Sequence, residues 1–129
     1  MSGETDLTKL LQNMKPERHA GEYAFCQVKT MQQAVELQPV GLFSEQEGVT
    51  VILPKHQAEA AQLPHPVAMV WITLTVHSSL EAVGLTAAVS KALTEANISC
   101  NVIAAYFHDH LFVPAADADR AMNVLLSIR

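Results

Sequence analysis

Apolar and polar side chains alternate along residues 70–77, and the apolar positions are Val70, Ile72, Leu74 and Val76. This period of two predicts a strand with one buried face. A polar turn at residues 77–79 follows the strand. From Leu85 to Ala96 the apolar residues instead recur every three or four positions, as in an amphipathic helix. The predicted order is therefore strand, loop containing Gly84, helix.

The remainder of this half predicts two more strands and a second helix. Asn97 can stop the first helix, and residues 99–107 and 111–113 read as strands joined across His108-Asp109-His110. The second helix is expected from about Asp117 to Ile128. The order strand-helix-strand-strand-helix is most of a split βαβ unit, in which two helices cover one face of an antiparallel sheet.

The first residues predict a short helix and then a strand. Asp6 can cap a helix with apolar residues at helical spacing, and Pro16 closes it. Residues 23–28 alternate as a strand does. Residues 29–38 favour neither a helix nor a strand, so no clear helix is expected between the first two strands of this half.

A predicted hairpin follows. Residues 40–43 and 49–53 form two strand-like runs, and Gly48 between them can adopt a positive φ. A helix rich in alanine is expected over residues 56–61. Residues 63–66 contain two prolines and therefore predict a stiff linker.

The chain contains a short internal repeat, whose two copies are sixty residues apart. The run Val-Ile-Leu-Pro at 51–54 and its helix match Leu-Phe-Val-Pro at 111–114 and the helix after it. Each copy is a buried strand, a proline that stops it, and a helix with small residues. We therefore expect two related half-domains, residues 1–63 and 64–129.

Composition narrows the possible functions. Half of the 129 residues are apolar, so one compact domain or two small modules can bury a core. Thirteen acidic residues outnumber eight basic ones, giving a net charge of −5 without a basic cluster, which argues against nucleic-acid binding. The longest apolar run is too short to span a membrane. Two distant cysteines and the absence of a signal-peptide pattern predict a cytoplasmic protein with reduced thiols.

The second half resembles an ACT domain, the ligand-sensing version of the ferredoxin-like fold. The first half is similar to the module that precedes it in small bacterial proteins with paired ACT domains, and related domains occur in aspartate kinase regulatory regions and in the cytosolic arginine sensor. The resemblance is carried by residues 71–76, 83–93, 96–102 and 106–114, and in the first half by 21–26 and 47–50. It implies an α+β protein with two ACT-like halves in tandem.

One departure from the family concerns the fourth strand. An ACT unit normally ends with a fourth strand, but here the last predicted helix runs to the end of the chain. That strand must be missing, or be supplied by the other half or by another copy of the chain. An open sheet edge invites pairing, so a homodimer or a higher homo-oligomer is expected.

The resemblance also implies a ligand site for a small molecule, usually an amino acid, at the loop between the first strand and helix and at module interfaces. In this loop Gly84 allows close approach and the free amides of the helix start attract a carboxylate. The other wall would come from the adjoining strand. The expected ligand-binding residues are Ser78, Ser79, Gly84, Leu85, Thr86, Asn101, Val102 and Ile103. The competing interpretation is that the serines cap the helix and that the glycine only relieves packing.

Other chemistry is weakly indicated. The motif His108-Asp109-His110 could hold a metal, but a turn between the histidines and the lack of a third ligand favour a solvated hairpin tip. Cys26 and Cys100 lie on predicted strands, where core packing is the simpler interpretation. No motif of a known catalytic class is present, and no cofactor is expected.

We therefore expect a non-catalytic regulatory or sensing protein that binds an amino acid or a similar small molecule. The alternative is a structural module that assembles through its sheet without binding a ligand. If Trp71 were exposed, it would mark a contact with the other half or another subunit.

Overall fold

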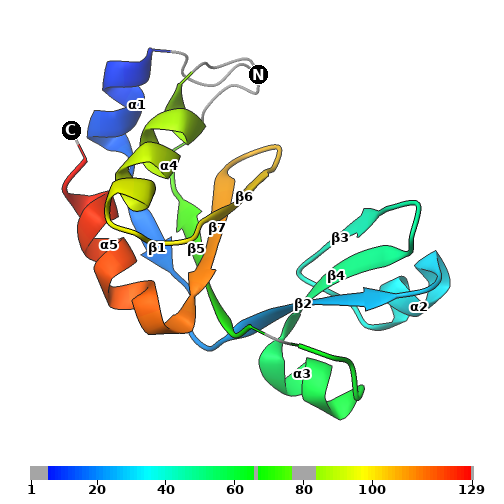
Figure 1. The fold of residues 1–129 in the computed structure, drawn as a ribbon. Coiled ribbons are helices and arrows are strands. Elements are labelled where there is room, and N and C mark those ends of the chain that lie inside the picture. Colours follow the sequence, from blue (N-terminus) through cyan, green and yellow to red (C-terminus); the bar gives the residue numbers. More distant parts are fainter. Residues whose placement is uncertain (1–5, 66, 77–83, 129) are drawn as a thin grey trace. The chain divides into compact units, whose positions relative to one another are not determined.

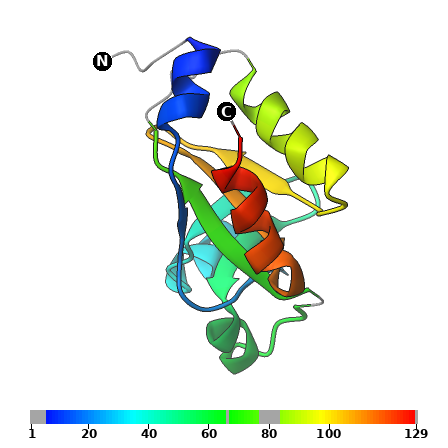
Figure 2. The ribbon, with the colours of Figure 1, turned by 90° about the vertical axis from the view of Figure 1, so that its left-hand side faces the viewer.

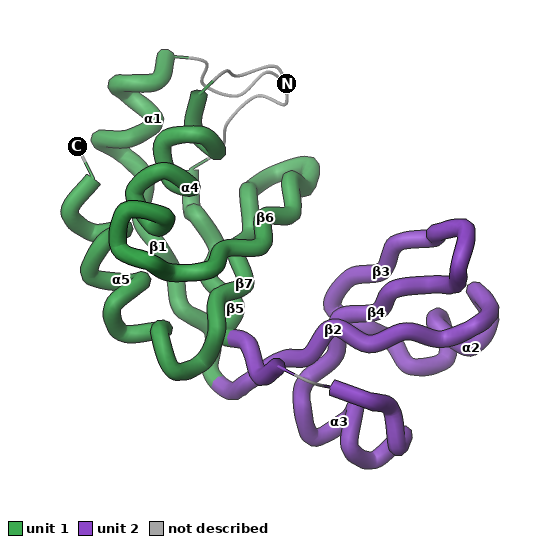
Figure 3. The backbone as a smooth tube through the Cα atoms, in the orientation of Figure 1, with its two compact units in different colours: residues 1–20, 70–129 green, residues 21–69 purple. Residues whose placement is uncertain are grey.

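The computed structural model describes residues 6–65, 67–76 and 84–128. The chain divides into two compact units, which are coloured separately in Figure 3. Unit 1 contains residues 1–20 and 70–129, and unit 2 contains residues 21–69. The family expectation of an α+β protein with antiparallel sheets and helices is confirmed.

Unit 1 is a four-stranded sheet with helices on one face, as Figures 1 and 2 show. The strands follow one another in the order β1-β5-β7-β6. They are β1 (Pro16–Arg18), β5 (Met69–Leu74), β7 (Asp109–Pro114) and β6 (Asn101–Ala104). The helices are α1 (Leu7–Asn13), α4 (Leu85–Glu95) and α5 (Ala118–Leu126), the last preceded by the 3-10 turn η1 (Ala115–Asp117).

Strand β1 provides the fourth strand that the C-terminal sequence lacks. It pairs antiparallel with β5, with Pro16 opposite Leu74 and Arg18 opposite Ile72. Of the three alternatives, the strand is therefore supplied by the N-terminal part of the chain. Sequence patterns do not predict it, because three residues are too few for a period and Pro16 also fits the end of α1.

The core of unit 1 confirms the predicted strand and helix. Asp6 caps α1 as expected, since its Oδ1 accepts hydrogen bonds from the amides of Thr8 at 2.9 Å and Lys9 at 3.3 Å. The helix α4 lies on β5 through apolar side chains at helical and strand spacing. These buried residues include Val70, Ile72 and Leu74 of the strand and Leu85, Val89 and Leu93 of the helix.

Unit 2 has three strands and two short helices. The strand order is β3-β4-β2, and both pairings are antiparallel. The elements are β2 (Tyr23–Val28), α2 (Met31–Glu36), β3 (Gly41–Ser44), β4 (Val49–Pro54) and α3 (Lys55–Ala60). The core consists mainly of small side chains, among them Ala24, Cys26, Ala34 and Val51, together with Leu53.

The helix α2 corrects the prediction that no clear helix lies between the first two strands of this half. Thr30 accepts a hydrogen bond from the amide of Gln33 at 3.2 Å, and the Gln33 side chain accepts one from the Thr30 amide at 3.1 Å. This reciprocal capping box is the missed signal, because the pattern Thr-x-x-Gln marks a helix start.

The compact units group the first residues differently from the predicted halves. The sequence predicts a division near residue 63, whereas residues 1–20 pack with residues 70–129. The reason is physical: α1 and β1 complete the core and sheet of the C-terminal part. The division at residue 63 therefore remains a prediction about related half-domains rather than about compact units.

Candidate functional site

Gly84 forms the entrance to α4. Its φ is +103°, in the left-handed region that favours glycine. A Cβ atom there would lie 3.1 Å from Cδ2 of Leu7 in α1, so α1 packs closely against this entrance. Leu85 is buried in the core and Thr86 is exposed. The predicted residues Ser78 and Ser79 lie outside the described part of the chain.

The predicted residues of β6 are not all near Gly84. The chain passes from the C-terminal end of α4 directly into β6, so Asn101 lies at the end of α4 that is remote from Gly84. Asn101 Nδ2 donates to the Phe112 carbonyl at 3.2 Å and fixes the β6–β7 pairing. Val102 and Ile103 are half-buried, and Val102, opposite Leu111, faces the helices, whereas Ile103, opposite His110, lies on the other face of the sheet. Sequence reasoning missed this because it did not use the direction of the strand.

The hairpin between β6 and β7 differs from the prediction. The turn is formed by residues 105–108, where the Ala105 amide donates to the His108 carbonyl at 3.1 Å. Tyr106 and Phe107 are exposed at the turn. The prediction of a solvated tip at 108–110 is therefore wrong, because Asp109 and His110 already belong to β7.

Asp109 is a buried carboxylate on the helix-facing side of the sheet. Its side chain alternates with His110 and shares a face with Leu111 and Val113, which pack in the helix-covered core. Asp109 is 9% exposed as a residue, and its carboxylate oxygens, which make no hydrogen bond or ion pair to another described residue, are not fully shielded from solvent. Burial raises the pKa of Asp109, against the opposing effect of His110 and His108.

Asp109 and the entrance to α4 lie at the same end of unit 1. His108 Nδ1 lies 3.5 Å from the carbonyl of Val76, the second residue of the connection from β5 to α4. Figure 1 shows the β6–β7 turn and the start of α4 at this end. A carboxylate and the positive end of a helix are thus located at one edge of the sheet.

The opposite face of the sheet carries a hydrogen-bonded network. Trp71 is half-buried, and its Nε1 donates to Nδ1 of His110 at 3.1 Å. The Oγ1 of Thr73 lies 3.0 Å from the same nitrogen and 2.7 Å from Nε2 of His19, whose ring stacks on Trp71 at 3.7 Å. Because the indole can only donate, Nδ1 of His110 must accept and the ring is neutral.

Burial is the largest cause that lowers the pKa of His110, followed by the charges of His108 and His19, while Asp109 acts in the opposite direction. Protonation of Nδ1 would remove the acceptor of the Trp71 N–H. When His110 is neutral, the network therefore holds His19, the residue after β1, against the sheet. These histidines have a structural role that the sequence did not reveal.

The described residues were compared with the requirements of a metal site and of a membrane-spanning helix. They contain no group of three or more His, Cys, Asp or Glu placed to hold a metal ion. They also contain no helix that is both long and apolar enough to cross a bilayer. Both cysteines are free, and burial raises the pKa of each thiol.

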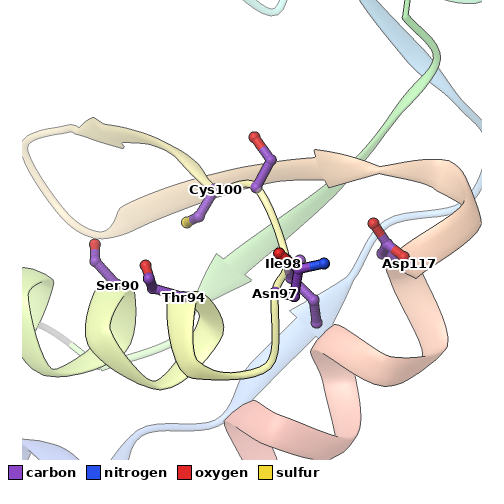
Figure 4. Close-up of a pocket in the computed structure, with 7 residues that line it drawn as sticks. Ser90, Thr94, Asn97, Ile98, Cys100 and Asp117 are labelled. Carbon is purple, nitrogen blue, oxygen red and sulfur yellow. The ribbon is translucent and has the colours of Figure 1, made fainter.

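A pocket of about 450 Å³ lies at the C-terminal end of α4, as Figure 4 shows. Ser90 and Thr94 occupy successive turns of the helix, and their hydroxyl groups face the connection that leads into β6. The full lining is Ser90, Thr94, Asn97, Ile98, Ser99, Cys100 and Asp117. None of these residues was predicted as a site, because serine and threonine on the polar face of a helix usually indicate only solvation.

Comparison with known protein families assigns both parts of the chain to the same family. Two sequence profiles, each described as ACT domain, match residues 2–70 and 68–127. No curated protein matches the chain.

Solved structures with similar folds come from several bacteria. A Vibrio cholerae protein of unknown function, described as a possible transport protein, shares 47% identity over 90% of each chain with a TM-score of 0.83. An Agrobacterium tumefaciens protein is 15% identical with a TM-score of 0.64, over 88% of this chain and 87% of its own. The aspartate kinase regulatory subunit of Thermus thermophilus is 8% identical with a TM-score of 0.56, over 89% and 95% of the two chains.

Proposed function

Because the chain belongs to the ACT domain family and carries two such domains in tandem, we propose that it is a non-catalytic cytoplasmic regulatory protein that senses an amino acid. The proposed site lies in unit 1, at the entrance to α4. Its residues are Gly84, Leu85 and Thr86, with Asp109 and the predicted Ser78 and Ser79, whereas Ile103 is left out because it pairs with His110 on the other face of the sheet.

The single observation that supports an amino acid is the combination of Asp109 with the start of α4. A free amino acid carries a carboxylate and an ammonium group a few bonds apart. The amides at the start of α4 attract the carboxylate, since Gly84 has no side chain to occupy them. Asp109, which is buried without a described partner, offers its charge to the ammonium group.

The raised pKa of Asp109 gives this proposal a pH dependence. An ammonium group beside the carboxylate favours its ionised form, so bound ligand lowers the pKa. Binding at low pH must therefore displace a proton from Asp109. Affinity should fall as pH decreases through the raised pKa of this group.

A thermal-shift screen with the twenty amino acids tests the proposal. We expect a selective rise in melting temperature, which at a ligand concentration of one hundred times Kd corresponds to about 2.7 kcal/mol. Asp109→Asn and Thr86→Val should each reduce the shift. Glu17→Gln and Ser127→Ala remove an exposed carboxylate and an exposed hydroxyl elsewhere in unit 1 and should not. If none of the twenty amino acids raises the melting temperature of the unmodified chain, the sensing function is rejected.

A second candidate function is assembly without a ligand. In unit 2 apolar side chains are exposed on α2, namely Met31 and Val35, and on or beside the edge strand β3, namely Val40, Leu42 and Phe43, with Phe43 on the sheet face that α2 does not cover. The strand itself contains no charged residue to discourage pairing. This surface suits a second copy of the chain, which would give the expected homodimer.

Light scattering after size exclusion separates the two candidates. Phe43→Glu and Val35→Glu should convert a dimer into a monomer, whereas Val67→Glu, at an exposed position outside this surface, should not. Self-association together with a flat ligand panel would favour assembly over sensing. A monomeric unmodified chain would contradict the assembly function.

A further inference from the structure

The helix α1 packs against the entrance to α4 through one apolar side chain, that of Leu7. If Gly84 carried a Cβ atom, its three nearest atoms beyond the adjoining residues would be Cδ2, Cδ1 and Cγ of Leu7, at 3.1, 3.6 and 3.8 Å. Both helices begin at the same end of unit 1, as Figure 2 shows. Leu7 therefore fills the space beside Gly84 into which a larger group would project.

We propose that Leu7 is the specificity-determining residue of the amino-acid site and selects a ligand with a short apolar side chain. The inference rests on the proposed function, because it takes the carboxylate of the ligand to lie on the amides that follow Gly84. Asp109 lies on the sheet, whereas Leu7 lies on a helix that packs against α4. The ammonium group and the side chain of the ligand therefore meet different walls.

The wall next to Gly84 is made of hydrocarbon. Leu7 is half-buried and packs against the core of unit 1, as does Val76 in the connection from β5 to α4. Neither side chain can form a hydrogen bond, so a polar ligand side chain would lose its hydrogen bonds to water without replacement. An apolar side chain gains free energy when it leaves water. This wall therefore favours an apolar ligand.

The position of Leu7 is fixed by its own helix. Asp6 accepts hydrogen bonds from two amides of the first turn of α1, and Leu10, on the next turn, is fully buried. Because packed side chains leave little free volume, a ligand must fit the space beside Leu7 rather than create it. Short side chains such as those of alanine and α-aminobutyrate meet this condition, and long ones do not.

Calorimetric titration of the full chain with an unbranched series of amino acids tests the proposal. Glycine, alanine, α-aminobutyrate, norvaline and norleucine each add one carbon to the one before. We expect the highest affinity at alanine or α-aminobutyrate and a loss of about tenfold for each further methylene. Serine, which resembles α-aminobutyrate in size but is polar, should bind more weakly than it. An optimum at norleucine, or tighter binding of serine, would overturn the proposal.

Variants of α1 assign the selection to one side chain. Leu7→Ala should move the optimum to norvaline or norleucine, and the milder Leu7→Val should move it by about one methylene. Leu11→Ala is the matched control, because Leu11 also packs on the core from α1 but is not among the atoms nearest to Gly84. It should leave the optimum unchanged.

The outcomes separate this inference from the proposed function. If amino acids bind but Leu7→Ala and Leu7→Val leave the optimum in place, or Leu11→Ala moves it equally, Leu7 does not determine specificity and the sensing function stands. The same holds if the unmodified chain binds only amino acids with long side chains. If it binds no amino acid, the inference and the proposed function both fail.

Discussion

The connection from the first strand to the first helix is built differently in the two units. In unit 2, residues 29 and 30 alone connect β2 to α2, and Thr30 and Gln33 occupy each other's free amides. In unit 1 the connection runs from residue 75 to 84 and ends at Gly84, which has no side chain to cap α4. The start of α2 is satisfied by its own capping box, whereas no side-chain cap from Gly84 occupies the first amides of α4. The proposed site uses this difference between the two units.

The cores of the two units also differ, because unit 1 buries larger side chains than unit 2. Unit 1 buries leucine and isoleucine, among them Leu10, Ile72 and Leu93, between the sheet and three helices. The cluster in unit 2 consists mainly of alanine and valine. Since buried area determines the hydrophobic contribution, unit 2 should be the less stable of the two. Local unfolding should therefore begin in unit 2.

Core truncation should have the largest effect and should be greater in unit 1. Leu93→Ala removes a fully buried side chain and should cost about 2–5 kcal/mol of unfolding free energy. Val51→Ala in unit 2 removes fewer atoms and should cost about 2 kcal/mol. Chemical denaturation followed by circular dichroism measures both. A larger loss for Val51→Ala would contradict the comparison of the cores.

Gly84→Ala should have the next largest effect. The substitution places a side chain at φ +103° and 3.1 Å from Leu7, so it should cost about 2–4 kcal/mol through strain and crowding. Gly21→Ala is the matched control, because its φ is +83° but no atom lies within 4 Å of the new Cβ. This control should cost about 1 kcal/mol. Equal losses would show that α1 does not pack on the entrance to α4.

Loss of the capping box should have a smaller effect that is confined to unit 2. Thr30→Ala removes the acceptor for the Gln33 amide and should cost about 1 kcal/mol. Hydrogen exchange should become faster at the amides of α2 and remain unchanged in α4. Gln32→Ala, at a neighbouring exposed position, should leave both helices unaffected. Faster exchange in α4 would contradict the independence of the two junctions.

The smallest effect should be a pH dependence of unit 1 that comes from His110. Its pKa is lowered from 6.5 in the folded state, so the unfolded chain binds more protons in the interval between the two values. Its contribution to stability is complete above about 6.5 and is lost as pH falls through the folded pKa. His110→Asn should flatten the dependence of melting temperature on pH in this interval. An unchanged slope would exclude His110 as its source.

Much of unit 1 could be predicted because its elements have strong periods. The strand at 70–76, the helix from Leu85 and the cap at Asp6 all combine an apolar period with a start or stop signal. The family resemblance, carried by the same runs, is shown by the ACT domain profiles.

Other features depend on tertiary contacts that a local pattern does not contain. The strand β1 is defined only by its pairing with β5, and α2 only by a two-residue reciprocal cap. From the sequence alone, Asp109 is expected in a turn. The register of β7 instead places it on the helix-facing side of the sheet. The separation of Asn101 from Gly84 likewise follows from the direction of β6.

An amide-resolved NMR titration of the intact chain with the amino acid selected by thermal shift tests the central claim most directly. We predict shifts at residues 84–88 and near Asp109, and no shift at residues 29–33, where the capping box already satisfies the helix start. Shifts centred on residues 29–33, or no shift at the entrance to α4, would contradict the claim that only unit 1 provides an amino-acid site.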